Sequence, residues 1–303
     1  MTVEDTHTKN DSAGESATAS SKDETVKRTG LDWWIYEAKE TGLTIAIFLP
    51  IWLLLTSFVF ELRSIPSESM VPNLQIGDRV AVAKYAYGYG RYSPAFGIGT
   101  WFTKEDKTKP NQKIFASEPK RGDVIVFRHP NDNKVMIKRL IGLPGDRIQM
   151  IEGHLHINGE AVEREVVRRF RYTPHGKPMS ENTIEYRETL PNGVSYLTHK
   201  FAGSQSFDDT PEFIVPAEHV FMMGDNRDNS EDSRSPRGHL ELYKENPNGW
   251  GGRRFAVGDT PSTIGFVPYD HLMGRGETVF FTLSRCKKAP ESKCPTSRVW
   301  RGL

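Results

Sequence analysis

The stretch LTIAIFLPIWLLLTSFVF, residues 43–60, contains no charged side chain, and Ser67-Glu68-Ser69-Met70 follows it closely. As an α-helix this stretch would be about 27 Å long, close to the roughly 30 Å hydrocarbon core of a bilayer. Ser69 lies nine residues beyond Phe60, and an extended chain reaches at most about 3.3–3.6 Å per residue. We therefore expect a transmembrane helix at 43–60 and a serine hydroxyl held near the membrane surface.

A buried core helix and a cleavable signal peptide are the two alternatives for residues 43–60. Pro50 lies inside the stretch, and proline is tolerated in membrane helices but is costly in a water-exposed helix. The stretch leads directly into Glu61-Leu62-Arg63 without a small-x-small cleavage site. These features favour an uncleaved anchor.

The amino-terminal segment, residues 1–42, is expected to be a cytoplasmic tail with an interfacial end. Residues 1–29 contain no aromatic residue. They cannot bury enough apolar surface to offset the entropy of ordering, so we expect them to be disordered. Basic residues are more numerous before the apolar stretch than after it: Lys27, Arg28 and Lys39 against Arg63. The positive-inside rule then predicts a cytoplasmic amino terminus.

Beyond Arg63, short alternating or β-branched runs separated by turn signals dominate the sequence, which is typical of an all-β fold. The runs are Arg79–Ala83, Asp123–Arg128, Lys134–Ile141, Arg147–Ile157 and Thr278–Leu283. Asn158-Gly159 predicts a two-residue hairpin turn. We expect an antiparallel-sheet core made by residues 61–152 and 216–285, with a second β subdomain inserted at 153–215 and a basic, solvated tail at 286–303.

Composition leaves several questions open. With 40 basic and 39 acidic side chains, the charge gives no global reason to expect nucleic acid. Cys286 and Cys294 are too few for a zinc site with four cysteine ligands, and a local disulfide and two free thiols both remain open.

Residues 85–102 are aromatic and nearly uncharged, which fits either core or a surface resting on lipid headgroups. Residues 235–263 resemble an irregular excursion.

A serine hydroxyl needs a neighbouring base before it becomes a useful nucleophile. None of the nine histidines lies in a segment that is otherwise distinctive. Lys138 is another candidate base, since a buried, neutral amine accepts protons. It lies in the apolar run Val135–Gly142. Periodicity alone, however, favours an edge strand from which Lys138 and Arg139 both reach water.

The segment Gly224–Arg234 is dense in turn formers and charges, which indicates a loop held by its own hydrogen bonds. A calcium loop is the alternative, because Asp225, Asp228 and Asp232 offer oxygen ligands, although the EF-hand spacing is absent.

Together these segments resemble the bacterial type I signal peptidases, membrane-bound serine proteases that remove signal peptides from exported preproteins. The resemblance covers roughly residues 43–283, and its blocks occur in the family's order. They are Ile65–Leu74 with Ile76–Asp78, Arg121–Val124, Ile137–Arg139 with Gly142–Asp146, Gly224–Arg234, and Gly265–Pro268 with Gly274-Arg275. The resemblance reverses the interpretation of Lys138, because it implies that Ser69 is the nucleophile and Lys138 the buried general base.

The resemblance also implies supporting roles for five residues. Ser67 corresponds to the hydroxyl that helps the Ser69 amide to stabilise the oxyanion, and Ser230 to a serine that hydrogen-bonds the lysine. Asp232 and Arg234 correspond to a supporting salt bridge. Arg139 corresponds to a structural position. This sequence departs from the family at residues 235–264, which separate two blocks, and at Glu68, which occupies the variable position between the two serines.

The family's substrates carry small residues, typically alanine, at positions −3 and −1, which implies shallow apolar pockets beside Ser69. The candidate lining residues are Ile65, Pro66, Ile125 and Ile137. The implied partners are secretory preproteins and membrane lipid. The implied chain is a monomer that binds no nucleic acid and uses no metal or cofactor. The implied location is the bacterial inner membrane, with the catalytic domain on its outer, periplasmic side.

Two functional alternatives belong to other classes. A membrane-tethered β domain that binds exported chains without cleaving them would need no lysine in an apolar strand. Self-cleaving regulators use the same Ser-Lys chemistry, but they carry a DNA-binding domain and lack an anchor, which is the reverse of the pattern here.

Overall fold

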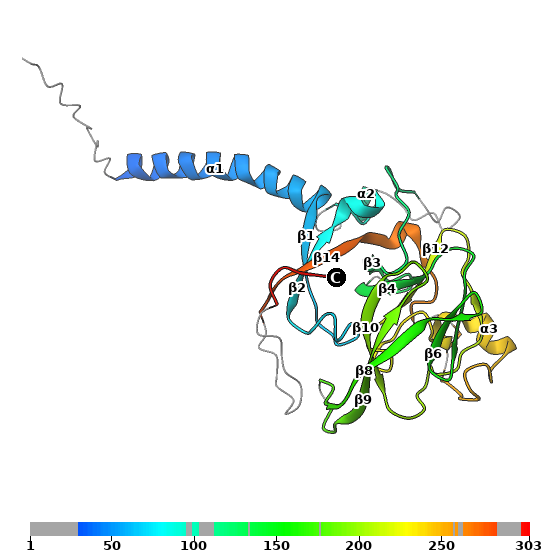
Figure 1. Cartoon of the computed structure of the whole chain (residues 1–303). Helices are drawn as coiled ribbons and strands as arrows, with labels where there is room; N and C mark the ends of the chain where they lie inside the picture. Colours follow the sequence, from blue (N-terminus) through cyan, green and yellow to red (C-terminus); the bar gives the residue numbers. More distant parts are fainter. Residues whose placement is uncertain are drawn as a thin grey trace, which may run out of the picture. The chain divides into compact units, whose positions relative to one another are not determined.

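The structure, a computed structural model, describes residues 30–94, 99–102, 112–132, 134–175, 177–256, 258–259, 263–283 and 298–303 (Figure 1). The disorder expected for residues 1–29 and the redox state of Cys286 and Cys294 concern residues outside these ranges. Residues 50–303 form one compact unit.

Helix α1 (Leu31–Phe58) begins at Leu31 rather than at residue 43. The cause is the sequence Glu-Ala-Lys-Glu at residues 37–40, whose members are strong helix formers and extend the helix beyond the apolar stretch. The interfacial end expected within residues 1–42 is therefore helical from Leu31 onward. Within the described residues, α1 is the one helix long and apolar enough to cross a membrane, over Trp33–Phe58, although a signal sequence would meet the same criterion.

The main sheet is antiparallel, as predicted, with strand order β1-β2-β14-β3-β4-β12-β13 and β15 paired to β14. Figure 1 shows that β14, from late in the chain, lies between β2 and β3, which come early. The strands are β1 (Phe60–Ser64), β2 (Asp78–Ala83), β3 (Val124–Arg128), β4 (Val135–Gly142), β12 (His219–Met223), β13 (Val267–Pro268), β14 (Leu272–Thr282) and β15 (Arg301–Gly302).

Strand β3 is buried on both faces, which explains its unbroken apolar run. Val124 and Val126 belong to one apolar cluster, whereas Ile125 and Phe127 belong to another. Strand β4 follows β3 in the sheet and has β12 on its other side, so β4 is a central strand. The edge-strand interpretation of Lys138 was therefore wrong, because a side chain of a central strand covered on both faces does not reach water.

Two smaller sheets complete the β structure. One has the order β11-β5-β6-β7 and the other the order β10-β9-β8. Their strands are β5 (Arg147–Ile151), β6 (His154–Ile157), β7 (Glu160–Ala161), β8 (Glu163–Tyr172), β9 (Glu181–Thr189), β10 (Ser195–Phe201) and β11 (Phe213–Ile214). The run expected over Arg147–Ile157 is thus a hairpin of β5 and β6. The expected subdomain boundary at residue 153 falls inside this hairpin, and we propose that the inserted region begins before β5.

The hairpin turn predicted at Asn158-Gly159 is confirmed. Ile157 pairs with Glu160 across it. Asn158 and Gly159 have φ values of 57° and 86°, so both residues take the left-handed conformation that a type I′ turn requires.

The segment 235–263 contains regular structure, so its description as an irregular excursion was incomplete. It forms the 3-10 helix η3 (Pro236–Gly238) and helix α3 (Leu240–Glu245). Trp250 is fully buried and its ring packs against Phe213 and Tyr243. Trp250 Nε1 donates a 2.9 Å hydrogen bond to the Arg234 carbonyl oxygen, which anchors the segment beside the Gly224–Arg234 loop.

The aromatic segment 85–102 divides between core and surface. It contains part of the 3-10 helix η1 (Lys84–Tyr87) and the short helix α2 (Gly99–Phe102). A further 3-10 helix, η4 (Tyr269–His271), lies outside this segment, later in the chain. Tyr87 and Tyr92 are buried, whereas Tyr85 and Trp101 are exposed. The core interpretation therefore holds for Tyr87 and Tyr92, and contact of the exposed residues with lipid headgroups stays a prediction.

Candidate active site

The structure brings Ser69 and Lys138 together from distant parts of the sequence. Ser69 lies in the turn-rich segment between β1 and β2, and Lys138 lies on β4. Lys138 Nζ donates a 2.6 Å hydrogen bond to Ser69 Oγ. Lys138 is 2% exposed and Ser69 is 7% exposed, so the bond is almost completely shielded from water.

Burial changes the protonation of this lysine. Desolvation lowers the pKa of Lys138 to about 8, although the carboxylates of Asp232 and Asp225 act in the opposite direction. At pH 7 about a tenth of the amine is therefore neutral, far more than for a free lysine with a pKa of about 10.4. A neutral amine hydrogen-bonded to a hydroxyl can accept the hydroxyl proton.

Ser67 lies on the open side of the pair. Its Oγ is 3.4 Å from Ser69 Oγ, and its residue is exposed. Among the described residues, the backbone N–H of Ser69 has no backbone acceptor. The Ser67 hydroxyl and the Ser69 N–H thus lie close to Ser69 Oγ. Both are donors that the carbonyl oxygen of a substrate can use.

Ser230 lies at the site without the hydrogen bond that was expected. Its Oγ is buried, and within the described part of the chain it has no hydrogen-bond partner. The lysine amine is directed at Ser69 Oγ instead. A Cβ at Gly224 would overlap both Ser230 Oγ and the Ser69 carbonyl oxygen, so only glycine lets these two segments approach so closely.

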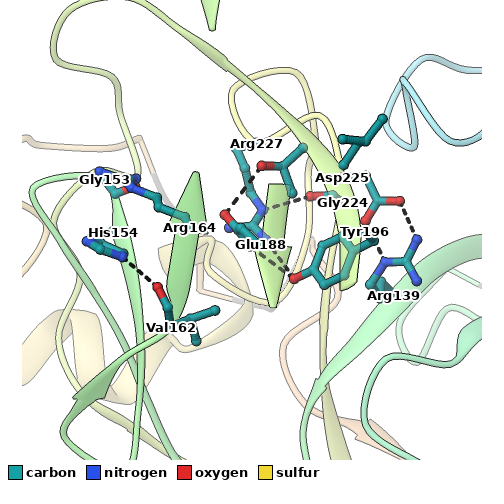
Figure 2. Close-up of polar contacts among 12 residues, drawn as sticks. Arg139, Gly153, His154, Val162, Arg164, Glu188, Tyr196, Gly224, Asp225 and Arg227 are labelled. Atoms are coloured by element: carbon teal, nitrogen blue, oxygen red, sulfur yellow. Dashed lines mark hydrogen bonds and ion pairs between the residues drawn. The ribbon is translucent and has the colours of Figure 1, made fainter. Parts of the chain in front are cut away.

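Two buried ion pairs surround the dyad. Arg234 contacts Asp232 through Nε and Nη2 at 2.9 and 2.8 Å, as expected. Asp232 also accepts a 2.9 Å bond from the Gly224 N–H. Arg139 contacts Asp225 through Nε and Nη2, both at 2.8 Å, and Figure 2 shows this second pair beside the Tyr196 ring. These pairs fix the loop on which Ser230 lies and the strand residue that follows Lys138.

The three aspartates proposed as calcium ligands have other partners. Asp225 and Asp232 pair with arginines, and Asp228 accepts a hydrogen bond from the Phe201 N–H. In the described part of the chain no group of three or more His, Cys, Asp or Glu side chains is arranged to hold a metal ion. The calcium-loop interpretation has no support.

Comparison with known proteins identifies the family. A family model described as signal peptidase, peptidase S26, matches residues 38–281. The chain belongs to this family. A signal peptidase I of Rickettsia akari (strain Hartford) is 33% identical over 275 residues, covering 88% of this chain and 84% of the relative. Another, of Rickettsia felis, is 39% identical over 255 residues, covering 81% and 80%.

A solved signal peptidase I from Enterococcus faecalis V583 is 21% identical, and the match covers 52% of this chain and 97% of that chain with a TM-score of 0.26. The family model and the Rickettsia relatives show that this chain is an S26 peptidase.

The residues expected to line a substrate pocket in this S26 peptidase do not share one cluster. Ile65 and Ile137 belong to the apolar cluster that contains Met70. Ile125 belongs to another cluster, and it pairs with Lys138 across β3 and β4. Pro66 is exposed. Ile65 and Ile137 therefore lie on one side of the sheet, and Ile125 lies on the other side, which is the side of Lys138.

Sequence reasoning assigned no role to two residues that help to hold the site of this peptidase together. Asn73 Nδ2 donates to Asp225 Oδ2 at 2.8 Å and to the Leu197 carbonyl oxygen at 2.7 Å. Glu68 accepts a 2.8 Å bond from the His175 N–H. Asn73 and Glu68 flank the nucleophile in the sequence, and that proximity was the one signal for them.

Proposed function

We propose that this peptidase removes amino-terminal signal peptides from exported preproteins, with Ser69 as nucleophile and Lys138 as general base. The observation that carries the proposal is the 2.6 Å hydrogen bond between Lys138 Nζ and Ser69 Oγ in a site shielded from water. The Rickettsia relatives are signal peptidases I, and this similarity supports the substrate class.

In the proposed first step, Ser69 Oγ attacks the carbonyl carbon of the scissile bond while its proton moves to the neutral Lys138 Nζ. The carbonyl oxygen becomes an oxyanion, for which the Ser69 N–H and the Ser67 hydroxyl are the proposed donors. The tetrahedral intermediate then collapses, and the leaving amine takes its proton from Lys138. This releases the mature protein and leaves the signal peptide as an ester on Ser69.

In the second step a water molecule gives a proton to Lys138 and attacks the ester carbonyl. A second tetrahedral intermediate collapses, and Ser69 Oγ recovers its proton from the lysine. Each step alternates the amine between neutral and charged forms, which is why a pKa of about 8 suits the role.

Cleavage after small residues and attachment to the inner membrane are further parts of the proposal. Ile65 and Ile137 pack with Met70, the residue after Ser69, and Ile125 pairs with Lys138 across β3 and β4, which supports apolar pockets for alanine at positions −3 and −1. Helix α1 has the length and composition of a single membrane span. The bias of basic residues towards its amino side supports a cytoplasmic amino terminus and a periplasmic β domain.

The experiment is cleavage of a preprotein with an Ala-x-Ala site by the full-length enzyme in detergent micelles. Ser69→Ala and Lys138→Arg are expected to abolish cleavage, because guanidinium does not release its proton in proteins. Ser204→Ala, an exposed serine, and Lys134→Arg, an exposed lysine, are matched controls that retain activity. Wild-type cleavage rates in Ser69→Ala would rule out Ser69 as the nucleophile, whereas a wild-type protein that binds the preprotein without cleaving it would favour a non-catalytic domain.

A further inference from the structure

Asn226 holds the backbone on both sides of Ser69. Its backbone N–H donates a 3.1 Å hydrogen bond to the Ser69 carbonyl oxygen. Its side-chain Nδ2 donates a 3.1 Å hydrogen bond to the Glu68 carbonyl oxygen. Asn226 is fully buried, so water does not compete for these bonds. One residue of the Gly224–Arg234 loop therefore fixes two consecutive peptide groups of the nucleophile segment.

These two peptide groups determine the conformation of Ser69. A peptide group is planar, so a residue has only the two soft dihedrals φ and ψ. For Ser69, the plane shared with Glu68 sets φ, and the plane shared with Met70 sets ψ. In a trans peptide the C=O and N–H point in opposite directions, so holding the Glu68 carbonyl also aims the Ser69 N–H. Holding both planes fixes the direction in which Oγ leaves the backbone.

Asn226 is itself held by strand β10. The His199 N–H donates to the Asp225 carbonyl oxygen at 2.9 Å, and the Arg227 N–H donates to the His199 carbonyl oxygen at 2.8 Å. Asn226 lies between these two bonds. Figure 2 shows the Arg227 side chain reaching Glu188 and Tyr196 on strands β9 and β10. The three-stranded sheet thus supplies a fixed base from which Asn226 reaches the nucleophile.

The side-chain oxygen of Asn226 gives a second argument. Oδ1 is buried and, among the described residues, accepts no hydrogen bond. A buried acceptor without a partner lowers stability, so stability alone does not explain an asparagine at this position. The Nδ2 donor does explain it, since an apolar side chain would leave the Glu68 carbonyl with only the 3.1 Å bond from the Val71 N–H, which comes from the nucleophile segment itself.

We propose that Asn226 is a positioning residue for the acyl transfer, which aims the Ser69 N–H at the oxyanion and Ser69 Oγ at the scissile carbonyl. This inference rests on the proposed function of Ser69 and Lys138. Asn226→Ala and Asn226→Asp retain the backbone N–H that donates to Ser69 and lack the side-chain donor to Glu68. The loss therefore falls on the alignment of one peptide plane.

The test compares Asn226→Ala and Asn226→Asp with wild type in the full-length enzyme. Asn192→Ala is the matched control, because Asn192 Nδ2 also donates to a backbone carbonyl, that of Arg121 at 2.7 Å. We expect kcat to fall about 10–100-fold in both Asn226 variants, the size expected for a misaligned donor or nucleophile. KM stays within about twofold if the bond to Glu68 acts only in the transition state.

Two inhibitors separate positioning from binding. A peptide aldehyde ending in alanine forms a tetrahedral adduct with Ser69 that carries the oxyanion, so its inhibition constant rises with the loss of kcat. The matching product peptide, with a free carboxylate, forms no adduct, and its inhibition constant is unchanged. The control Asn192→Ala shifts neither constant.

Three results would overturn the inference. They are an unchanged kcat in both Asn226 variants, an equal weakening of both inhibitors, and loss of cooperative thermal unfolding in both variants, which would make Asn226 a residue of the fold. Ser69→Ala is measured in the same assay. If Ser69→Ala still cleaves, the proposed function fails; if only the Asn226 variants behave as wild type, the positioning role alone fails.

Discussion

Arg298 forms a buried ion pair with Asp78, with Nη2 at 2.6 Å from Oδ2. Arg298 Nη2 also donates to the Asn73 carbonyl oxygen at 2.8 Å. Both partners lie in the segment that carries Ser69 into β2. Arg298 was expected in a solvated tail, and that expectation was wrong, because the end of the chain returns to the main sheet as β15 beside β14. The last residues of the chain therefore support the nucleophile segment.

Replacing Arg298 should destabilise the protein far more than replacing Arg301. Asp78 is fully buried, and Arg298→Gln would leave its carboxylate without the guanidinium, which typically costs about 3–5 kcal/mol. Arg301 is exposed on β15, so Arg301→Gln should cost less than about 0.5 kcal/mol. Urea unfolding of the two variants measures both values, and equal losses would contradict the role assigned to Arg298.

The pH profile of cleavage should report the state of Lys138. Since the base must be neutral, kcat/KM should rise with pH through a midpoint near the lysine pKa of about 8 and fall below it. The Asp232 carboxylate raises this pKa, so Asp232→Asn should move the midpoint to lower pH. Asp132→Asn, at an exposed position, is the control and should leave it unchanged. A midpoint that moves to higher pH in Asp232→Asn would refute the electrostatic argument.

Lys138 should also reduce the stability of the fold. Its folded pKa of about 8 lies below the 10.5 of the exposed amine. Between these values the unfolded chain binds more protons, so wild-type stability rises with pH across this window. Below pH 8 the charged Lys138 amine lowers the free energy of unfolding by its full amount, about 3 kcal/mol. Lys138→Met, of similar length and without charge, should be more stable than wild type at pH 7, and the difference should shrink between pH 8 and 10.5.

That stability comparison has a clear negative outcome. If Lys138→Met is no more stable than wild type at pH 7, or if the difference is independent of pH from 8 to 10.5, the amine is not desolvated as the structure indicates. Lys134→Met, on an exposed residue, controls for the general effect of adding a methionine.

The sequence was sufficient for the parts of the fold that depend on local pattern. Strands β2, β3 and β4 follow from alternation and β-branched residues, and the turn at Asn158-Gly159 follows from backbone preference. The burial of Lys138 did not follow, because periodicity describes one strand and not its neighbours. Only the pairing of β4 with both β3 and β12 makes that position internal.

For the site, the resemblance to a family supplied the dyad of Ser69 and Lys138 and the pair of Asp232 and Arg234, but not the other contacts between segments. Asp232 and Arg234 are close in sequence, and their pairing could be predicted. Asp225 pairs with Arg139, and Arg298 pairs with Asp78, across long sequence separations. No local pattern selects one partner for a buried carboxylate from 40 basic residues, so these contacts depend on the tertiary fold.

Breaking the pair between Arg139 and Asp225 should destabilise the site from within. Both side chains are buried, at 3% and 1% exposure, and removing one partner leaves an unpaired charge at a cost of about 3–5 kcal/mol. Asp225→Asn should therefore lower the urea midpoint strongly. Glu212→Gln breaks a similar two-bond pair with Arg147 at the surface and should have little effect, because surface pairs contribute little. Comparable losses in the two variants would show that burial does not decide the cost.

Glu68 should hold the tip of the β8–β9 hairpin against the nucleophile segment. Its carboxylate accepts hydrogen bonds from the His175 N–H at 2.8 Å and from Asn229 Nδ2 at 3.3 Å. Burial and the hydrogen bond to Glu68 raise the pKa of Tyr172, at the end of β8. Hydrogen bonds to charged groups contribute about 1.5–3 kcal/mol, so Glu68→Ala should speed hydrogen exchange at the His175 amide by about 10–100-fold.

The matched control for this exchange experiment is Glu231→Ala. Glu231 is an exposed glutamate of the Gly224–Arg234 loop, and its one ion pair in the described structure is a long contact of 3.7 Å with Arg237. Its removal should leave exchange at His175 unchanged. If Glu68→Ala also leaves exchange at His175 unchanged, the hairpin tip is held by other contacts, and the residue between the two serines does not couple it to Ser69.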